Sequence, residues 1–121
     1  MATVLVIDDD RSFRDYLEIL LRRAGYDVRS LGRAAEAVAL VTGGGIDAVI
    51  TDLYMPEVDG IETVRAIKRV APDLPVICIS GGYPDASDPC LNIVRVLGAD
   101  AVLPKPMRPR DLLDRLVPTQ H

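Results

Sequence analysis

The sequence is poor in cysteine and histidine, with two cysteines and one histidine in 121 residues. Cys78 lies in an apolar run and Cys90 in a polar segment, without the short Cys–Cys spacing or the histidine partner of a metal site. A disulfide framework is equally unsupported by so few cysteines. The sequence therefore indicates reduced thiols in a cytosolic protein.

Long apolar runs and an excess of basic residues are also missing. No run approaches the ~20 apolar residues of a membrane span, and the opening MATVLVIDDD lacks the basic segment of a signal peptide. The 14 basic residues are scattered and outnumbered by 18 acidic ones, for a net charge of −4. We therefore expect a cytoplasmic protein with no membrane insertion and no direct contact with nucleic acid.

What the sequence does contain is a regular alternation of β-branched runs and helical patterns, without repeats or linkers. A chain of 121 residues falls in the usual range of one domain, so we expect a single domain over residues 1–121. The alternation predicts an α/β fold with a five-stranded, doubly wound parallel sheet. The expected strands are Thr3–Ile7, Val28–Leu31, Asp47–Thr51, Pro75–Ile79 and Ala101–Leu103.

Apolar residues between these runs recur with helical spacing and predict the helices. Gly25 is expected to end the first helix, and Asp59 with Glu62 has the spacing of a capping box for the third. The expected helices carry Phe13 to Ala24, Ala34 to Val41, Ile61 to Ile67, Leu91 to Leu97 and Pro109 to Leu116.

The carboxyl ends of parallel strands form the functional edge of such a sheet, so the residues that follow each strand are the candidates for chemistry. Each of them also has an ordinary structural explanation as a helix cap, a turn residue or a solvated side chain. The candidates are Asp8, Asp9 and Asp10 after the first strand, Asp52 after the third, Ser80 after the fourth and Lys105 after the fifth.

Together these residues indicate phosphoryl transfer. If the first and third strands are neighbours, Asp8, Asp9 and Asp52 converge, and their like charges need a cation such as Mg²⁺. A carboxylate beside the metal, Asp52, could then attack phosphorus and form an aspartyl phosphate. Lys105 offers a positive charge and Ser80 a hydroxyl donor to the phosphoryl oxygens.

Four segments in order, VLVIDDD, VITDLYMPEVDG, VICISGG and GADAVLPKPM, resemble the motif blocks of the response-regulator receiver domain. The resemblance covers essentially the whole chain, and it implies a flavodoxin-like (βα)5 sheet with strand order 2-1-3-4-5. It also implies a Mg²⁺ cofactor and a role for each matching residue. By this resemblance, Asp52 is the phosphoacceptor, Asp8 and Asp9 are the acidic pair, and Tyr54 is a metal ligand through its backbone carbonyl. Ser80 is the switch hydroxyl and Lys105 is the phosphate-binding lysine.

The function implied by the resemblance is a phosphoacceptor in a two-component system or phosphorelay. A histidine kinase or a histidine phosphotransfer protein would donate the phosphoryl group, and the affinity for an unknown protein target would change. Such a domain is not an enzyme for external substrates, although it assists its own phosphotransfer and dephosphorylation. Because no output segment follows the last helix, we expect a free-standing receiver.

The sequence departs from the family pattern at the fifth strand. Most members have an aromatic residue where this chain has Val102, and the segment Gly81 to Pro89 is longer and richer in glycine and proline than usual. We therefore hypothesise that this segment, with Tyr83, replaces the aromatic residue as the mobile element.

Two alternatives keep part of the pattern. Asp8 and Asp10 are spaced as in haloacid-dehalogenase-type phosphatases, where the first aspartate is the nucleophile, but Asp111 and Asp114 are the only acids after the lysine and fit a solvated helix face. A phosphorylation-independent interaction domain would keep the fold and lose the chemistry.

Overall fold

The computed structural model describes residues 2–53, 60–80, 95–104 and 107–116. Its strands are β1 (Thr3–Ile7), β2 (Asp27–Leu31), β3 (Ala48–Asp52), β4 (Val76–Ser80) and β5 (Ala101–Pro104). Its helices are α1 (Arg11–Arg23), α2 (Ala37–Thr42), α3 (Gly60–Val70) and α5 (Pro109–Leu116). The predicted helix through Leu91 and Val94, the segment Gly81 to Pro89 with Tyr83, and the capping residue Asp59 lie outside the described residues.

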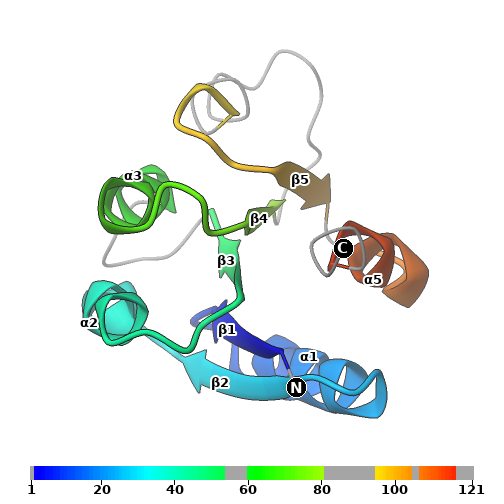
Figure 1. Cartoon of the computed structure of the whole chain (residues 1–121). Coiled ribbons are helices and arrows are strands. Elements are labelled where there is room, and N and C mark those ends of the chain that lie inside the picture. Colours follow the sequence, from blue (N-terminus) through cyan, green and yellow to red (C-terminus); the bar gives the residue numbers. More distant parts are fainter. Residues whose placement is uncertain (1, 54–59, 81–94, 105–106, 117–121) are drawn as a thin grey trace.

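The strands form one parallel sheet in the order β2-β1-β3-β4-β5, which confirms the expected doubly wound α/β fold. Figure 1 shows α1 and α5 on one side of the sheet and α2 and α3 on the other. The direction in which successive strands are added to the sheet reverses between β1 and β3. The functional crevice of such a sheet lies outside the carboxyl ends of the strands at this reversal.

Strand side chains alternate between two hydrophobic clusters, because successive residues of a strand point to opposite faces. Leu5 and Ile7 pack with α2 and α3, whereas Val4 and Val6 pack with α1 and α5. All five residues of β3 and of β4 are buried, as their nearly continuous apolar sequences predict. The sheet is therefore a rigid support for residues at its carboxyl edge.

In the described part of the chain, no helix has the length and apolar character needed to cross a membrane.

Helix α1 has the ends that its sequence predicts. The Asp10 side chain accepts a hydrogen bond of 3.2 Å from the Phe13 N–H, which makes Asp10 an N-cap rather than part of the acidic cluster. After the helix, Gly25 has φ of 97°, a left-handed conformation that glycine adopts without strain.

The structure differs from the sequence prediction in two local details. The helix expected over residues 34 to 41 is a 3-10 turn (Ala34–Glu36) followed by α2, and no side chain caps its start. Such tight turns are common at the N-termini of α-helices. In addition, the strand boundaries differ by one residue: β3 and β4 each begin and end one residue later than predicted, β2 begins one residue earlier, and β5 ends one residue later. Asp52 and Ser80 are therefore the last residues of their strands.

Cys78 lies in β4 and is a buried, free thiol. Burial, followed by the carboxylate of Asp100, raises the pKa of Cys78 to about 12, and Lys68 opposes this shift. The thiol is therefore protonated at neutral pH and is a poor nucleophile. This agrees with the reduced thiol that the sequence indicates at this position.

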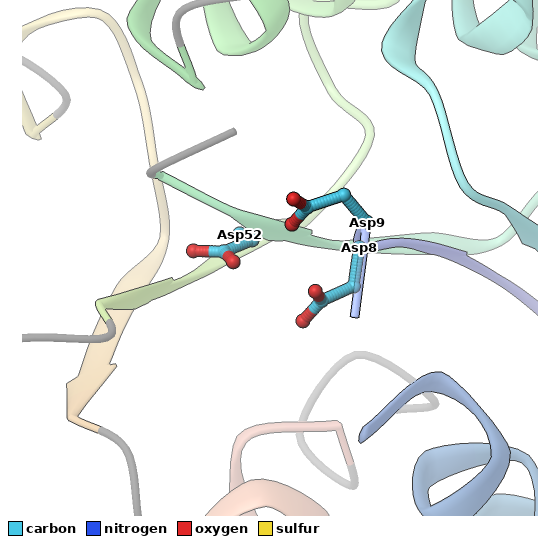
Figure 2. A group of neighbouring side chains, drawn as sticks. All are labelled: Asp8, Asp9 and Asp52. Carbon is cyan, nitrogen blue, oxygen red and sulfur yellow. The ribbon is translucent and has the colours of Figure 1, made fainter. Parts of the chain in front are cut away.

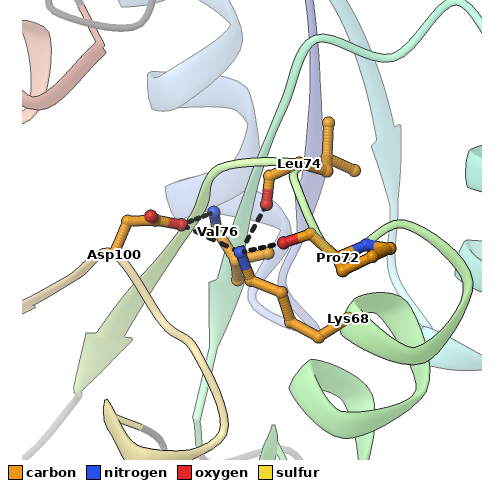
Figure 3. A network of polar contacts seen from close by, with 5 residues as sticks. All are labelled: Lys68, Pro72, Leu74, Val76 and Asp100. Atoms are coloured by element: carbon orange, nitrogen blue, oxygen red, sulfur yellow. Dashed lines mark hydrogen bonds and ion pairs between the residues drawn. The ribbon is translucent and has the colours of Figure 1, made fainter.

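A polar network lies at the beginnings of β4 and β5, at the opposite end of these strands from the candidate site (Figure 3). The Lys68 Nζ donates to the carbonyl of Leu74 at 2.7 Å and of Pro72 at 3.4 Å, and lies 3.2 Å from Asp100 Oδ2. That carboxylate oxygen also accepts the Val76 N–H at 2.7 Å. Lys68 thus joins the end of α3 to the beginnings of β4 and β5.

Replacing Lys68 by methionine is expected to destabilise the fold by roughly 1–3 kcal/mol, because carbonyl and carboxylate acceptors lose their donor while the apolar stem is kept. Urea unfolding measures the change. Asp100→Asn is the matched control, since an amide oxygen can still accept the Val76 N–H, and its loss should be smaller. An unchanged unfolding free energy for Lys68→Met would show that the network contributes nothing to stability.

Candidate functional site

The reversal of strand order places the ends of β1 and β3 side by side. Ile7 pairs with Thr51 in the sheet, so Asp8 follows β1 directly beside the last residue of β3, Asp52. Figure 2 shows the carboxylates of Asp8, Asp9 and Asp52 gathered at this edge. The predicted convergence of the acidic residues is therefore present.

The three carboxylates are close enough to share one cation. One oxygen from each of Asp8, Asp9 and Asp52 lies within 4.8 Å of the others. Asp8 is 1% exposed and Asp52 4% exposed, whereas Asp9 is open to solvent. At such separations the negative charges repel one another strongly, and repulsion is greatest where water is excluded.

The backbone around Asp8 is held from several sides. Its N–H donates to the Leu31 carbonyl at 3.1 Å, and its Oδ1 accepts the Asp10 N–H at 2.9 Å. Its carbonyl accepts a hydrogen bond of 2.7 Å from Nη1 of Arg14. The turn that carries the acidic pair is thus fixed to β2 and to α1.

Ser80 stands at the end of the next strand. Asp52 pairs with Ile79, and Ser80 pairs with Pro104, the residue before Lys105 in the sequence. Among the described residues the Ser80 hydroxyl is fully buried and makes no hydrogen bond. Because an unsatisfied buried hydroxyl is costly, its presence at the carboxyl edge makes Ser80 a candidate for binding a ligand group.

The remaining predicted site residues, Tyr54 and Lys105, lie outside the described residues.

Arg14 contacts the site, and sequence reasoning missed this contact. A signal for it exists, because Arg14 falls on the same helical stripe as the buried Leu17 and Leu21, where a charged residue needs a polar partner. That partner is the Asp8 carbonyl.

The donor set fits a hard divalent cation together with a phosphoryl group. Carboxylate oxygens are the ligands that Mg²⁺ prefers, and Mg²⁺ usually binds one or two carboxylates together with water and phosphate oxygens. The buried Ser80 hydroxyl could donate a hydrogen bond to phosphoryl oxygens. Among the described residues, the ligands that this cluster offers are carboxylate oxygens, which suit hard cations rather than soft transition metals.

A sequence profile of the response regulator receiver domain matches residues 4–117. The chain belongs to this family. It is therefore a phosphoacceptor signalling domain of the two-component type. The phosphatase alternative gains no support from the structure either, because its second aspartate, Asp10, caps α1.

Curated relatives include the DNA-binding transcriptional regulator NtrC of Azospirillum brasilense, 37% identical over 114 residues, and the response regulator MprA of Mycobacterium sp. (strain KMS), 36% identical over 115 residues. Both matches cover 93% of this chain but only 23% of the first protein and 48% of the second. The chain thus spans about a quarter to half the length of these relatives.

Solved receiver structures agree closely with the fold. A CheY-like receiver domain protein from Methanospirillum hungatei JF-1 superposes with a TM-score of 0.89 at 26% identity, covering 98% of this chain and 92% of that one. The second structure is a response regulator protein from Burkholderia pseudomallei with a phosphorylated aspartic acid, a calcium ion and citrate. It superposes with a TM-score of 0.85 at 27% identity, covering 96% of this chain and 66% of that one.

Addition of Mg²⁺ is expected to raise the melting temperature, because a cation that binds only the folded state stabilises it by mass action. At a concentration 100 times Kd the gain is about 2.7 kcal/mol, which corresponds to several degrees for a domain of this size. Thermal melts across a Mg²⁺ titration measure it. Asp9→Ala should flatten the response, and Asp15→Ala, an exposed aspartate on α1, should leave it intact. A parent melting curve that ignores millimolar Mg²⁺ would contradict the shared metal.

Proposed function

We propose that this receiver domain accepts a phosphoryl group on Asp52 with Mg²⁺ bound by Asp8, Asp9 and Asp52. The observation that carries the proposal is the buried Asp52 carboxylate within 4.8 Å of the two other carboxylates, at the point where the strand order reverses. Tyr54, through its backbone carbonyl, completes the proposed ligand set. A bound Mg²⁺ would neutralise negative charge on the carboxylates and on the incoming phosphoryl oxygens.

We assign the nucleophile to Asp52. Asp8 and Asp9 lie in the turn after β1, whereas Asp52 is the buried last residue of β3, the strand between β1 and β4. An oxygen of Asp52 would form a bond to phosphorus as the phosphorus–nitrogen bond of a phosphohistidine donor breaks. The imidazole nitrogen would keep the electron pair and become protonated from solvent.

The transferred group needs donors for its oxygens, since its negative charge is spread over them. The unpartnered hydroxyl of Ser80 is one donor, at the end of the strand next to β3. We assign the positive charge to Lys105, which follows the β5 residue paired with Ser80. These residues would hold the aspartyl phosphate and would also orient the water that removes it.

The partners follow from this chemistry. The donor would be a histidine kinase or a histidine phosphotransfer protein in the cytoplasm, and the phosphorylated domain would change its affinity for a protein target. The phosphorylated aspartic acid and the calcium ion of the Burkholderia pseudomallei relative support an aspartate and a divalent cation as parts of the site. β5 carries Val102 in place of an aromatic residue, so we assign the switching role to another element, the segment Gly81 to Pro89.

The proposal is tested by incubating the protein with a small acyl phosphate and Mg²⁺ and mapping the modified residue by mass spectrometry. Modification of Asp52 that disappears when Mg²⁺ is chelated is the expected result. A phosphoryl group on Asp8 would favour the phosphatase interpretation. Absence of modification under these conditions and with phosphohistidine donors would favour an interaction domain that works without phosphorylation.

A further inference from the structure

Arg14 contacts the acidic site through its backbone. Its Nη1 donates to the carbonyl of Asp8 at 2.7 Å, and the side chain is half-buried. This carbonyl belongs to the peptide group that joins Asp8 to Asp9. A planar peptide that is held at its oxygen can rotate little, so the contact constrains the direction in which the Asp9 side chain leaves the backbone.

Asp9 depends on this constraint more than Asp8 does. The Asp8 carboxylate accepts the Asp10 N–H, and the Asp8 N–H is bonded to the Leu31 carbonyl. With the described residues, by contrast, the exposed Asp9 carboxylate makes no hydrogen bond or ion pair. Its place beside the other carboxylates is therefore set by the backbone from which it projects.

Gly32 leaves the space that Arg14 occupies. A Cβ at this position would lie 3.0 Å from Nη1 of Arg14, closer than side chains ordinarily pack, and 3.6 Å from its Cζ, an ordinary contact distance. Gly32 is not among the glycines with positive φ, so its backbone conformation is open to alanine. The guanidinium group, rather than backbone strain, is what favours glycine here.

We propose that Arg14, seated against Gly32, is a positioning residue that orients Asp9 for metal binding. The inference rests on the proposed Mg²⁺ site and adds to it a support from α1 and from the residue after β2. Residues that orient metal ligands commonly change metal affinity by about 10- to 100-fold when they are replaced.

The positive charge and the hydrogen bond of Arg14 have opposite effects on Mg²⁺ affinity. The direction in which a substitution changes the affinity therefore tests the proposal. A guanidinium near the carboxylates repels Mg²⁺, so loss of its charge alone would tighten metal binding. Loss of its hydrogen bond would weaken binding by misplacing Asp9. Gly32→Ala keeps the charge and shifts only the flexible end of the side chain, and Arg14→Lys keeps the charge but loses the planar donor fork.

The experiment measures the Mg²⁺ dissociation constant by isothermal titration calorimetry, with urea unfolding in the absence of Mg²⁺ as a check on the fold. Gly32→Ala is expected to weaken binding by about tenfold, and Arg14→Met by less, because the loss of its positive charge partly offsets the loss of its hydrogen bond. Gly32→Ala should have no further effect when added to Arg14→Met, because the contact that it disturbs is already gone. Gly43→Ala, at the end of α2 with φ of −67°, is the matched control and should bind Mg²⁺ as the parent does.

The measured dissociation constants decide whether Arg14 positions Asp9 for metal binding. Tighter binding by Arg14→Met with unchanged binding by Gly32→Ala would show that Arg14 acts only through its charge, and would overturn the positioning role. Equal binding by all variants and the parent would also overturn it while leaving the metal site in place. A parent that binds no Mg²⁺ would instead overturn the proposed site itself, and this inference with it.

Discussion

Asp52→Asn is expected to reduce Mg²⁺-dependent phosphorylation below detection while the fold is kept. The amide has nearly the shape of the carboxylate but is a far weaker nucleophile, and it contributes no charge to the metal site. Asp52 is 4% exposed among carboxylates whose oxygens lie within 4.8 Å of one another. Removal of one of these like charges should slightly raise the unfolding free energy of the metal-free protein.

Radiolabelled or mass-spectrometric phosphorylation assays measure the first effect, and urea unfolding measures the second. Asp10→Asn is the matched control, because Asp10 lies close to the site in sequence but caps α1, and asparagine caps a helix about as well. This control should be phosphorylated like the parent. If the Asp52→Asn variant is modified at the parental rate, or if it loses several kcal/mol of stability, the assignment of Asp52 is refuted.

The fold was predictable because burial on both faces leaves a visible pattern. Strands such as β3 and β4 are apolar throughout most of their length, and Gly25 ends α1 with a positive φ that few other residues adopt. Periodicity alone did not determine the strand order, which entered through the resemblance to receiver domains. The short turn before α2 was missed because an alanine-rich sequence favours an α-helix, whereas 3-10 turns are frequent at helix N-termini.

The site was predictable where it depends only on which residue follows which strand. Asp8 and Asp52 converge because β1 and β3 are neighbours, and no other detail is needed. Arg14 was missed because its role depends on a long side chain that reaches a backbone carbonyl. The unpartnered state of Ser80 was likewise invisible, since it depends on which donors and acceptors the surrounding segments bring near.

Ser80→Ala is expected to change stability and phosphotransfer in opposite directions. The hydroxyl is fully buried and unpartnered among the described residues, so its removal should raise the unfolding free energy of the unphosphorylated protein by about 1 kcal/mol. The same change removes the donor that the proposed function assigns to the phosphoryl oxygens. Loss of one such preorganised donor typically slows group transfer by about 10²-fold.

Ser30→Ala is the matched control, because the Ser30 hydroxyl lies in β2 and donates to Glu18 Oε1 at 2.7 Å. That variant should lose rather than gain stability and should be phosphorylated at the parental rate. Urea unfolding and acyl phosphate kinetics with Mg²⁺ measure both effects on both proteins. A Ser80→Ala protein that is less stable and reacts normally would mean that the hydroxyl serves the fold alone. The opposite signs are expected because a buried hydroxyl without a partner costs stability, and the phosphoryl group, which is the ligand proposed for it, would offset that cost when bound.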